Sequence, residues 1–444
     1  METKTTLIKN GTLISPISEY KNPVILHKNA SILIENDKIA EIGEVSKIGS
    51  NISETNVDKV ITGENKIIMP SLINTHTHVS MSLLRGLADD LELDTWLNDH
   101  IWPMEAKLDG ELVYLGGLLS IVEMIKSGCT CFNDMYFFIE DLTKAVDESG
   151  TRGCLSYGML DFGDEEKRNN ELKESENIIK YIKNLKNERI KGYLGPHSPI
   201  TASQDLLEES RKIANKRDVG IHIHISETKK ELDDVIESKG KRPFEYLDDI
   251  GFLDEDVVAA HSVWLSDREI DIVKEKDVKV SHNPVSNMKL SSGIAPISKM
   301  LEKNVCVSLG TDGSASNNNL DLFEEMKFAS LLQKVSTLNP KILNAEETIK
   351  LATINGAKAL GLEDEIGSIE EGKKADIILI DTTSPNMTPN TNSLISHIVY
   401  AANGSNVDTT ICNGEILMEN KILTKLNERE IIEKANIINQ KLKE

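Results

Sequence analysis

Two short stretches of the chain place imidazole side chains at a spacing that suits a metal ion. The first contains His76 and His78, and the second contains His222 and His224, with Glu227 three residues after His224. Each stretch lies at the end of a short apolar run. A His-x-His pair on a strand points both rings to the same side, because side chains alternate with period two, so one ion can bind both. For a lone His-x-His pair, ordinary histidines in a half-buried strand remain an alternative.

Strand-like apolar runs recur further along the chain, and several end in a polar residue that can bind metal or substrate. These residues are Asn133 with Asp134, His197, His224, His261, His282 and Asp312. Segments with apolar residues at helical spacing lie between the runs, as at 112–125, 206–213 and 322–332. Strand and helix therefore alternate about eight times, which predicts an α/β fold with a (β/α)8 TIM-like barrel. A doubly wound open sheet is the alternative, but it would gather its ligands at one switch point.

The two ends of the chain read differently from the middle. Short strands separated by Asn, Asp and Gly turns are expected at 6–14, 30–43 and 57–61, and again at 375–381 and 409–418. Neither end is long enough for a core of its own, so we expect both to form one small β-sandwich domain. The predicted division is 1–65 for its first part, 66–369 for the barrel, and 370–444 for its second part with a C-terminal helix at 428–442.

Composition limits the classes of protein that this chain can be. With 444 residues, 39% of them apolar, the chain can bury a large core. A net charge of -22 argues against a nucleic-acid partner, because phosphate backbones require clustered cations. We find no apolar stretch of membrane-spanning length and no signal-peptide pattern, so a cytoplasmic location is expected. The five cysteines form no finger-type spacing, and we expect no disulfides.

Longer motifs give the chain a resemblance to a known family. They lie at 70–78, 96 with 102–105, 195–198, 222–228, 261, 281–290, 310–313 and 367–376. With them the chain resembles the amidohydrolase superfamily over nearly its whole length, and within it the 5-methylthioadenosine/S-adenosylhomocysteine deaminases. The set is highly specific for the superfamily. It is less specific for the substrate, because related chlorohydrolases and aminohydrolases share most of these motifs.

The resemblance implies a metal site made of His76, His78, His224 and Asp312. Three neutral nitrogens and one carboxylate suit Zn²⁺, and the same set of ligands can also bind Fe²⁺ or Mn²⁺. Two-metal members of the superfamily carry a carbamylated lysine on the fourth barrel strand, whereas that strand here ends in His197. One metal ion per subunit is therefore expected. Superfamily habit also implies a homo-oligomer.

The same resemblance assigns roles in catalysis. Glu227 would be the proton shuttle, taking a proton from the attacking water and giving it to a purine ring nitrogen. His261 would hold that water, and Asp312 would bind metal and also orient the water or accept its proton. The activity implied is hydrolytic deamination of adenosine-type nucleosides: 5′-methylthioadenosine, S-adenosylhomocysteine, 5′-deoxyadenosine or adenosine. A solvated residue at a helix start is the alternative for Glu227.

Substrate contacts are implied for three further residues. Glu105 would accept hydrogen bonds from the ribose hydroxyls, His197 would contact purine or ribose, and Trp96 would close over the ligand. Relatives that bind the homocysteine carboxylate use arginines after the third strand, where this chain has Tyr157 and only Arg168 is near. This difference favours substrates other than S-adenosylhomocysteine. Whether Arg168 or Tyr157 contacts substrate stays open.

Two other classes of function remain. One is a different amidohydrolase reaction at the same metal site, such as triazine chlorohydrolase or aminohydrolase activity or deamination of guanine or cytosine. Glu105 and His197 favour the nucleoside, because a free base or a triazine has no ribose diol to bind. The other is a non-catalytic scaffold, which the complete set of expected ligands disfavours.

Overall fold

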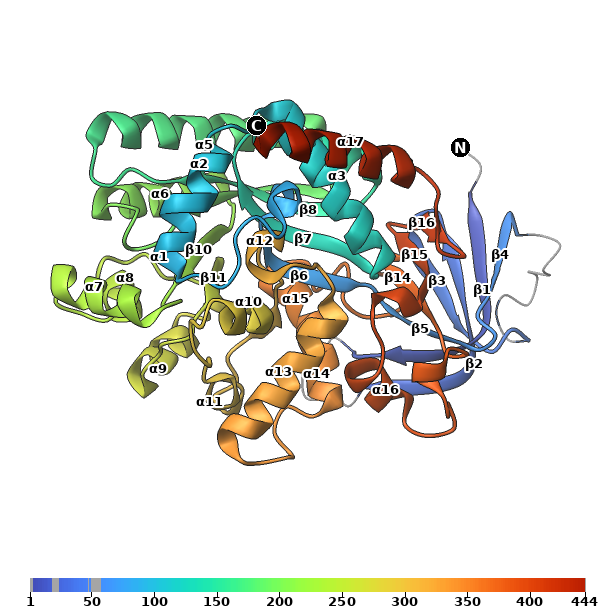
Figure 1. Cartoon of the computed structure of the whole chain (residues 1–444). Coiled ribbons are helices and arrows are strands. Elements are labelled where there is room, and N and C mark those ends of the chain that lie inside the picture. Colours follow the sequence, from blue (N-terminus) through green and yellow to red (C-terminus); the bar gives the residue numbers. More distant parts are fainter. Residues whose placement is uncertain (1–2, 18–23, 47, 49–56, 444) are drawn as a thin grey trace.

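The computed structural model describes residues 3–17, 24–46, 48 and 57–443 of the chain. Eight parallel strands form a nearly closed barrel, and nine further strands form a separate mixed sheet (Figure 1). The predicted α/β class and barrel are confirmed. Strands from the two ends of the chain lie side by side in the mixed sheet, at the opposite end of the molecule from helices α7 (Lys229–Lys239) and α8 (Pro243–Asp249).

The barrel strands follow one another in chain order, each paired in parallel with the next. They are β6 (Leu72–Thr77), β7 (Cys129–Tyr136), β8 (Arg152–Met159), β9 (Ile190–Pro196), β10 (Ile221–Ile225), β11 (Val257–His261), β12 (Lys279–His282) and β13 (Val307–Leu309). Every residue of β10 and β11 is buried, which is the pattern of parallel strands covered on both faces. This arrangement brings the carboxyl ends of all eight strands to one mouth.

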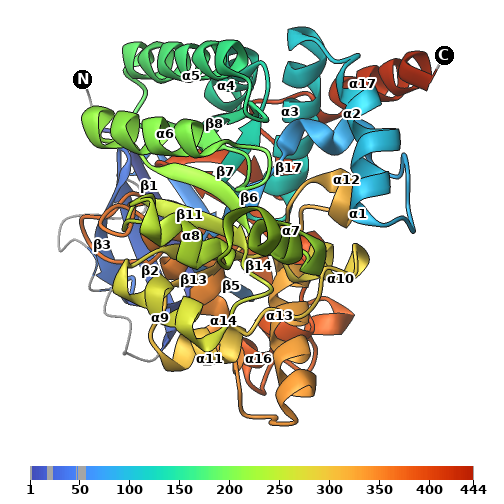
Figure 2. The same ribbon diagram turned by 90° about the vertical axis from the view of Figure 1, so that its left-hand side faces the viewer.

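Helices connect the strands and cover the outside of the barrel (Figure 2). The connecting helices, besides α7 and α8, are α3 (Gly110–Lys126), α4 (Ile139–Ser149), α5 (Glu165–Leu185), α6 (Gln204–Arg217), α9 (Asp267–Glu275), α10 (Pro284–Lys289) and α11 (Ile297–Glu302). After the last strand come α12 (Ser314–Asn317), α13 (Leu322–Thr337), α14 (Ala345–Ala352), α15 (Ile354–Ala359) and α16 (Leu394–Tyr400). The loop after β6 holds shorter helical pieces: η2 (Val79–Leu84), α1 (Leu93–Thr95), η3 (Trp96–Ile101) and α2 (Trp102–Glu105).

The barrel closes where the last strand meets the first. The Asp312 amide donates to the His76 carbonyl at 2.9 Å, and the Thr75 hydroxyl donates to the Leu309 carbonyl at the same distance. Gly310 permits this approach, because a Cβ at this position would stand 2.8 Å from the backbone nitrogen of His76 and 2.5 Å from Oδ1 of Asn283. The glycine therefore brings two predicted metal ligands from opposite ends of the barrel domain together.

The mixed sheet contains strands from both ends of the chain. Its strands are β1 (Thr5–Ser15), β2 (Ile25–Glu35), β3 (Lys38–Gly43), β4 (Lys59–Thr62), β5 (Lys66–Pro70), β14 (Ile377–Asp381), β15 (Val407–Cys412), β16 (Glu415–Glu419) and β17 (Ile422–Leu423). They enclose a second apolar core that includes Ile8, Ile34 and Leu379. A turn at Asn413 and Gly414 joins β15 to β16 with positive φ at both residues, as a tight hairpin requires. Strand β5 joins the N-terminal strands to β14, so residues 66–70 belong to this sheet and the barrel strands begin at Leu72.

A buried ion pair links the barrel to the mixed sheet. Arg152 on β8 donates through Nε and Nη2 to the two carboxylate oxygens of Asp376, at 2.9 and 3.0 Å. Their side chains are 2% and 1% exposed. Asp376 also accepts from the Asn413 amide at 2.8 Å and the Thr130 hydroxyl at 3.1 Å. Both charged groups are buried, and two parallel hydrogen bonds join them. This contact therefore fixes the relative position of the two sheets.

The C-terminal helix α17 (Glu428–Lys443) lies along α3 on the outside of the molecule (Figure 1). Lys126 pairs with Glu428 at 2.6 Å, and the Asn439 amide donates to the Leu83 carbonyl at 2.6 Å. Within the described ranges, none of the helices combines the length and apolar character needed to cross a membrane.

Candidate active site

A cavity of about 340 Å³ opens at the mouth of the barrel. All of the predicted site residues except His76 line it: His78, Trp96, Glu105, His197, His224, Glu227, His261 and Asp312. His76 lies fully buried next to the cavity, in contact with the other imidazoles. The structure therefore brings together residues that are up to 236 positions apart in the sequence, because each follows or ends a barrel strand.

The four predicted metal ligands converge on one point. Oδ1 of Asp312 lies 3.3 Å from Nε2 of His76 and 3.3 Å from Nε2 of His78. Nε2 of His224 lies 3.3 Å from Nε2 of His78. Four ligands at about 2.1 Å from a tetrahedral ion would stand about 3.4 Å apart, close to these separations. Nε2 of His76 is buried and has no hydrogen-bond partner among the described residues, so it is left free to bind a cation.

Hydrogen bonds on the far side of each ring aim the three histidines at that point. Nδ1 of His78 lies 2.7 Å from the Met135 carbonyl, and Nδ1 of His224 lies 2.8 Å from the His197 carbonyl. Nδ1 of His76 lies 2.7 Å from Nε2 of His222. Such partners fix which nitrogen carries the proton and leave Nε2 for the metal.

His222 is thus a supporting residue that sequence reasoning did not assign. It shares the His-x-His spacing with His224, and its ring reaches the back of His76 instead of the cavity. Burial lowers the pKa of His222 well below its usual value, so the ring is neutral. The repeated His-x-His pattern was the only sequence signal for this role.

Asp312 is held by several donors besides its histidine neighbours. Its Oδ2 accepts from the Ser286 hydroxyl at 2.6 Å and the Ser316 hydroxyl at 2.9 Å, and its Oδ1 accepts from the Gly313 amide at 2.7 Å. Burial opposes ionisation, but the neighbouring imidazoles, His76 above all, hold the pKa of Asp312 well below its usual range. The group is therefore a carboxylate, as a metal ligand must be.

Glu227 and His261 face one another in the cavity. Oε2 of Glu227 lies 3.8 Å from Nε2 of His261, and the Ser292 hydroxyl donates to Oε1 at 3.4 Å. Nδ1 of His261 lies 2.9 Å from Oδ1 of Asn287. Burial raises the pKa of Glu227, which makes its carboxylate a better proton acceptor. Burial lowers the pKa of His261, but the charges of Glu227 and Asp312 outweigh that effect and raise it.

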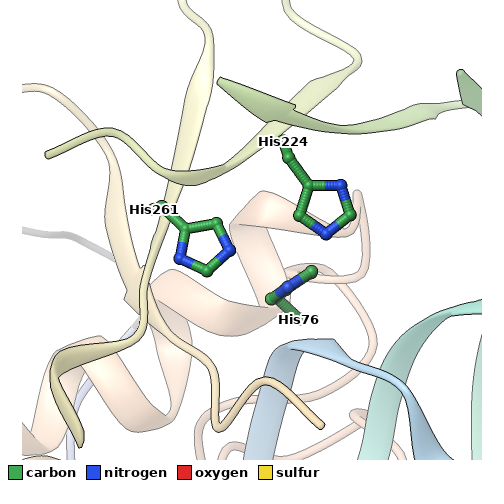
Figure 3. A group of neighbouring side chains, drawn as sticks. All are labelled: His76, His224 and His261. Atoms are coloured by element: carbon green, nitrogen blue, oxygen red, sulfur yellow. The ribbon is translucent and has the colours of Figure 1, made fainter. Parts of the chain in front are cut away.

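His261 also lies close to the point on which the four predicted metal ligands converge. One ring nitrogen from each of His76, His224 and His261 falls within 4.8 Å of the others (Figure 3). Figure 3 shows the three rings grouped around a common space, His261 from β11 and His224 from β10. A ring in this position can hold a water molecule next to a bound cation.

The three predicted substrate residues stand around the same cavity. Burial raises the pKa of Glu105 to about 7, with the Tyr136 hydroxyl acting in the opposite direction. Nδ1 of His197 lies 2.9 Å from the Thr201 hydroxyl, and burial lowers the pKa of His197 to about 4, so its ring is neutral. The indole of Trp96 is buried and donates to the Ala88 carbonyl at 3.1 Å.

Three residues that the sequence placed at strand ends do not face the cavity. Strand β7 continues to Tyr136, so Asn133 and Asp134 lie inside it; this corrects the predicted strand end. Asn133 donates to the Thr75 carbonyl at 3.0 Å, and Asp134 accepts from the Val79 amide at 2.7 Å. His282 is buried away from the cavity, and neither ring nitrogen has a hydrogen-bond partner within the part of the chain that the structure describes.

A second cavity, of about 610 Å³, adjoins the first. The two share Trp102, Glu105, Phe137, Leu160 and Phe162. Tyr157 lines only the second one. Arg168 lines neither, because its guanidinium pairs with Asp205 at 3.4 Å and Asp161 at 3.9 Å. Tyr157 therefore lines a cavity next to the predicted site, whereas Arg168 lines neither of the two cavities.

Comparison with known proteins agrees with this geometry. The sequence profile of the amidohydrolase family matches residues 67–417. The chain therefore belongs to the amidohydrolase family, as its motifs predicted.

Curated relatives define the group more narrowly. The 5′-deoxyadenosine deaminase of Methanobrevibacter smithii is 57% identical over 444 residues, covering 100% of this chain and 99% of the relative. That of Methanocaldococcus jannaschii is 51% identical over 416 residues, covering 94% and 97%. Among solved structures, a zinc-bound adenosine deaminase from Xanthomonas campestris has a TM-score of 0.93 at 30% identity, covering 99% of this chain and 98% of that one. A divalent metal at the histidine cluster is consistent with the zinc-bound structure.

Proposed function

We propose that this protein is a metal-dependent hydrolytic deaminase of adenosine-type nucleosides, with 5′-deoxyadenosine or another nucleoside bearing a small uncharged 5′ group as its substrate. One observation carries the proposal: three of the four metal donors, the carboxylate of Glu227 and the carboxylate of Glu105 line one cavity. The full-length similarity to 5′-deoxyadenosine deaminases supports the choice of substrate.

Zinc is the proposed metal, bound by His76, His78, His224 and Asp312. The donor separations of 3.3 Å suit a tetrahedral ion, and the set of three imidazoles and one carboxylate suits Zn²⁺, with Fe²⁺ or Mn²⁺ as alternatives. When bound, such a cation lowers the pKa of a coordinated water to about 7 in good cases, so that hydroxide is available at neutral pH.

The side chains around this point can carry out the remaining steps. Glu227 takes a proton from the attacking water and passes it to the purine nitrogen next to the reacting carbon. The new C–O bond forms at the carbon that bears the amine, the remaining proton of the water passes from the new hydroxyl to the amino group, and the C–N bond breaks to release ammonia. His261, 3.8 Å from Glu227, holds the water, and the Asp312 carboxylate orients that water or accepts its proton.

The cavity also suits a nucleoside. Glu105 offers acceptor oxygens for the two ribose hydroxyls, His197 offers a neutral ring for the purine or ribose, and Trp96 covers the ligand. The second cavity begins at Glu105, so it is placed to receive the group attached to the 5′ carbon. Its walls include the aromatic rings of Phe137 and Tyr157, which suit a methyl or methylthio group.

The second cavity offers no well-placed cation for a charged group on the 5′ carbon among its described lining residues. Arg168, which would be the candidate partner for a homocysteine carboxylate, is engaged with two aspartates. Lys167 lines the second cavity but lies 5.1 Å over the ring of Phe162. This supports 5′-deoxyadenosine and 5′-methylthioadenosine over S-adenosylhomocysteine.

A substrate panel tests the proposal. Zinc-loaded enzyme is mixed separately with 5′-deoxyadenosine, 5′-methylthioadenosine, S-adenosylhomocysteine, adenosine and guanine, and ammonia release is followed together with the ultraviolet change from adenine to hypoxanthine. We expect the first two to have the highest kcat/KM. The Glu227→Gln variant is the control and should lose about 10²- to 10⁴-fold in kcat. Metal-loaded enzyme that turns over none of the adenosine derivatives would overturn the proposal.

Three sequence predictions remain part of this proposal. They are the division of the chain into a barrel and a domain built from both ends, a homo-oligomeric state, and a cytoplasmic location. The second boundary stays at 369/370, and the first is proposed after β5 instead of at 65/66, because β5 pairs with β1 and β14.

A further inference from the structure

The turn that carries Glu227 has an unusual backbone. Ser226, directly before it, has φ of 56°, in the left-handed region that a non-glycine residue seldom adopts. Such a backbone conformation is strained and persists only where its surroundings hold it. The Ser226 carbonyl accepts from the Val263 and Trp264 amides at 2.9 and 3.1 Å, which holds one side of the peptide.

Glu231 holds the other side. Its Oε1 accepts from the Ser226 amide at 2.8 Å, and its Oε2 accepts from the Glu227 amide at 2.7 Å. Each carboxylate oxygen therefore binds one of two consecutive amides at the turn. No proposed contact with metal, water or substrate uses this residue.

A comparison within the chain shows that these bonds are not ordinary helix capping. Glu231 is the third residue of α7, after the N-cap Thr228. In a capping box, the glutamate at this position binds the amide of the N-cap itself. Glutamates at this position of other described helices do so: Glu269 accepts from the Ser266 amide at 2.9 Å, Glu347 from the Asn344 amide at 2.8 Å, and Glu245 from the Arg242 amide at 3.4 Å.

In α7 the glutamate reaches past the N-cap to the two residues before it. The helix start is still capped, because the Thr228 hydroxyl accepts from the Glu231 amide at 3.0 Å. The carboxylate is thus used for the turn that leads from β10 to Glu227, not for the helix end.

We propose that Glu231 is a positioning residue for deamination, which holds the left-handed turn at Ser226 and so aims the Glu227 side chain at the reacting atoms. This inference rests on the proposed role of Glu227. When Glu231 loses its second acceptor oxygen, Ser226 relaxes toward the ordinary extended or helical backbone and the carboxylate of Glu227 shifts. A displacement of about 1 Å at a reacting group can cost about 10²-fold in rate.

Glu231→Gln tests this directly, because the amide keeps the size of the side chain but sets an NH₂ group against one of the two backbone amides. We expect kcat for 5′-deoxyadenosine to fall about 10- to 100-fold, with KM changed less than about threefold, because proton transfer and not substrate binding is impaired. Bound metal should remain at the wild-type level. The matched control, Glu347→Gln, removes the same kind of carboxylate from the capping box of α14. Glu347 does not line the cavity, so this variant should leave kcat unchanged.

A kcat within twofold of wild type would overturn the inference, and so would a large rise in KM at unchanged kcat, which would make Glu231 a substrate contact. If the glutamine variant does not fold, Glu231→Asp, which keeps the charge but is one methylene too short, takes its place with the same expected result. Hydrogen exchange supplies a readout without activity: the Ser226 and Glu227 amides should exchange faster in the variant. Unchanged exchange at these two amides would refute the role of Glu231, whatever the activity of the enzyme. Wild-type enzyme that turns over no nucleoside would instead count against the proposed function alone.

Discussion

The substitution Glu105→Gln tests how the protein recognises a nucleoside. It removes the charge of the carboxylate and keeps its shape, at the wall shared by the two cavities. Hydrogen bonds to a charged group contribute about 1.5–3 kcal/mol and neutral ones about 0.5–1.5 kcal/mol, so each ribose hydroxyl should lose about 1–1.5 kcal/mol. For two hydroxyls the loss is about 2–3 kcal/mol, or about 30- to 150-fold in kcat/KM.

The pH dependence gives the same prediction an independent readout. With its pKa at about 7, Glu105 changes from acid to carboxylate as the pH rises through neutrality. The carboxylate is the better acceptor for the ribose hydroxyls, so kcat/KM of the wild type should rise through this range and level off above it. The glutamine variant has no group to titrate at this position and should lack that limb. The full 30- to 150-fold difference is therefore expected at about pH 8 and a smaller one at about pH 6.

The assay compares wild type and variant on 5′-deoxyadenosine and on 2′,3′-dideoxyadenosine, which lacks both hydroxyls. The two enzymes should differ less than about threefold on the dideoxy compound, since the interaction energy belongs to the hydroxyls. An equal loss on both substrates would refute the reasoning, because Glu105 would then act on the purine or on the fold. A loss confined to kcat would also contradict it, since binding of an unreacting part of the substrate is expected to appear in KM.

Three further predictions concern stability and the metal site. Asp376→Asn leaves the buried Arg152 without its carboxylate, which should cost about 3–5 kcal/mol; for 444 residues this lowers the calorimetric unfolding midpoint by about 3–5 °C, and a fall below about 1 °C would contradict it. Gly310→Ala sets a methyl group 2.8 Å from the backbone nitrogen of His76, so the bound metal measured by elemental analysis should fall below half of the wild-type content. In the control Gly43→Ala the nearest atom is 3.7 Å from the new methyl group, and the metal content should be unchanged. Removing metal with a chelator should abolish activity and lower the unfolding midpoint by about 3 °C for a metal present at 100 times its Kd, and one equivalent of Zn²⁺ should restore both; an unchanged midpoint would argue against a cation at His76.

Much of the site could be read from the sequence because parallel barrel strands all end at one mouth. His224, His261 and Asp312 are each marked by a preceding apolar run, and the period of two orients the rings of His76 and His78. These signals are local, so they survive without knowledge of neighbours. The predicted barrel, the family and the gathering of the site residues at one cavity follow from them.

Local patterns were less informative where a strand continues past its polar residues. Asn133 and Asp134 looked like a strand end, but their side chains satisfy backbone groups of Thr75 and Val79, and β7 runs on to Tyr136. The apolar run before His76 contains two strands, and the first of these, β5, joins the mixed sheet through β1 and β14. Which sheet a strand joins depends on partners hundreds of residues away.

The sequence by itself determined the alternation of strand and helix, the ligand types and the position of each ligand at a strand end. Only the tertiary structure decided which groups stand behind them: His222 behind His76, Ser286 behind Asp312, and Glu231 behind the turn to Glu227. It also decided that Arg168 is engaged by aspartates. The physical reason is that periodicity records which face of an element is buried, whereas hydrogen bonds and ion pairs depend on which side chain arrives from another element, and no local pattern encodes that meeting.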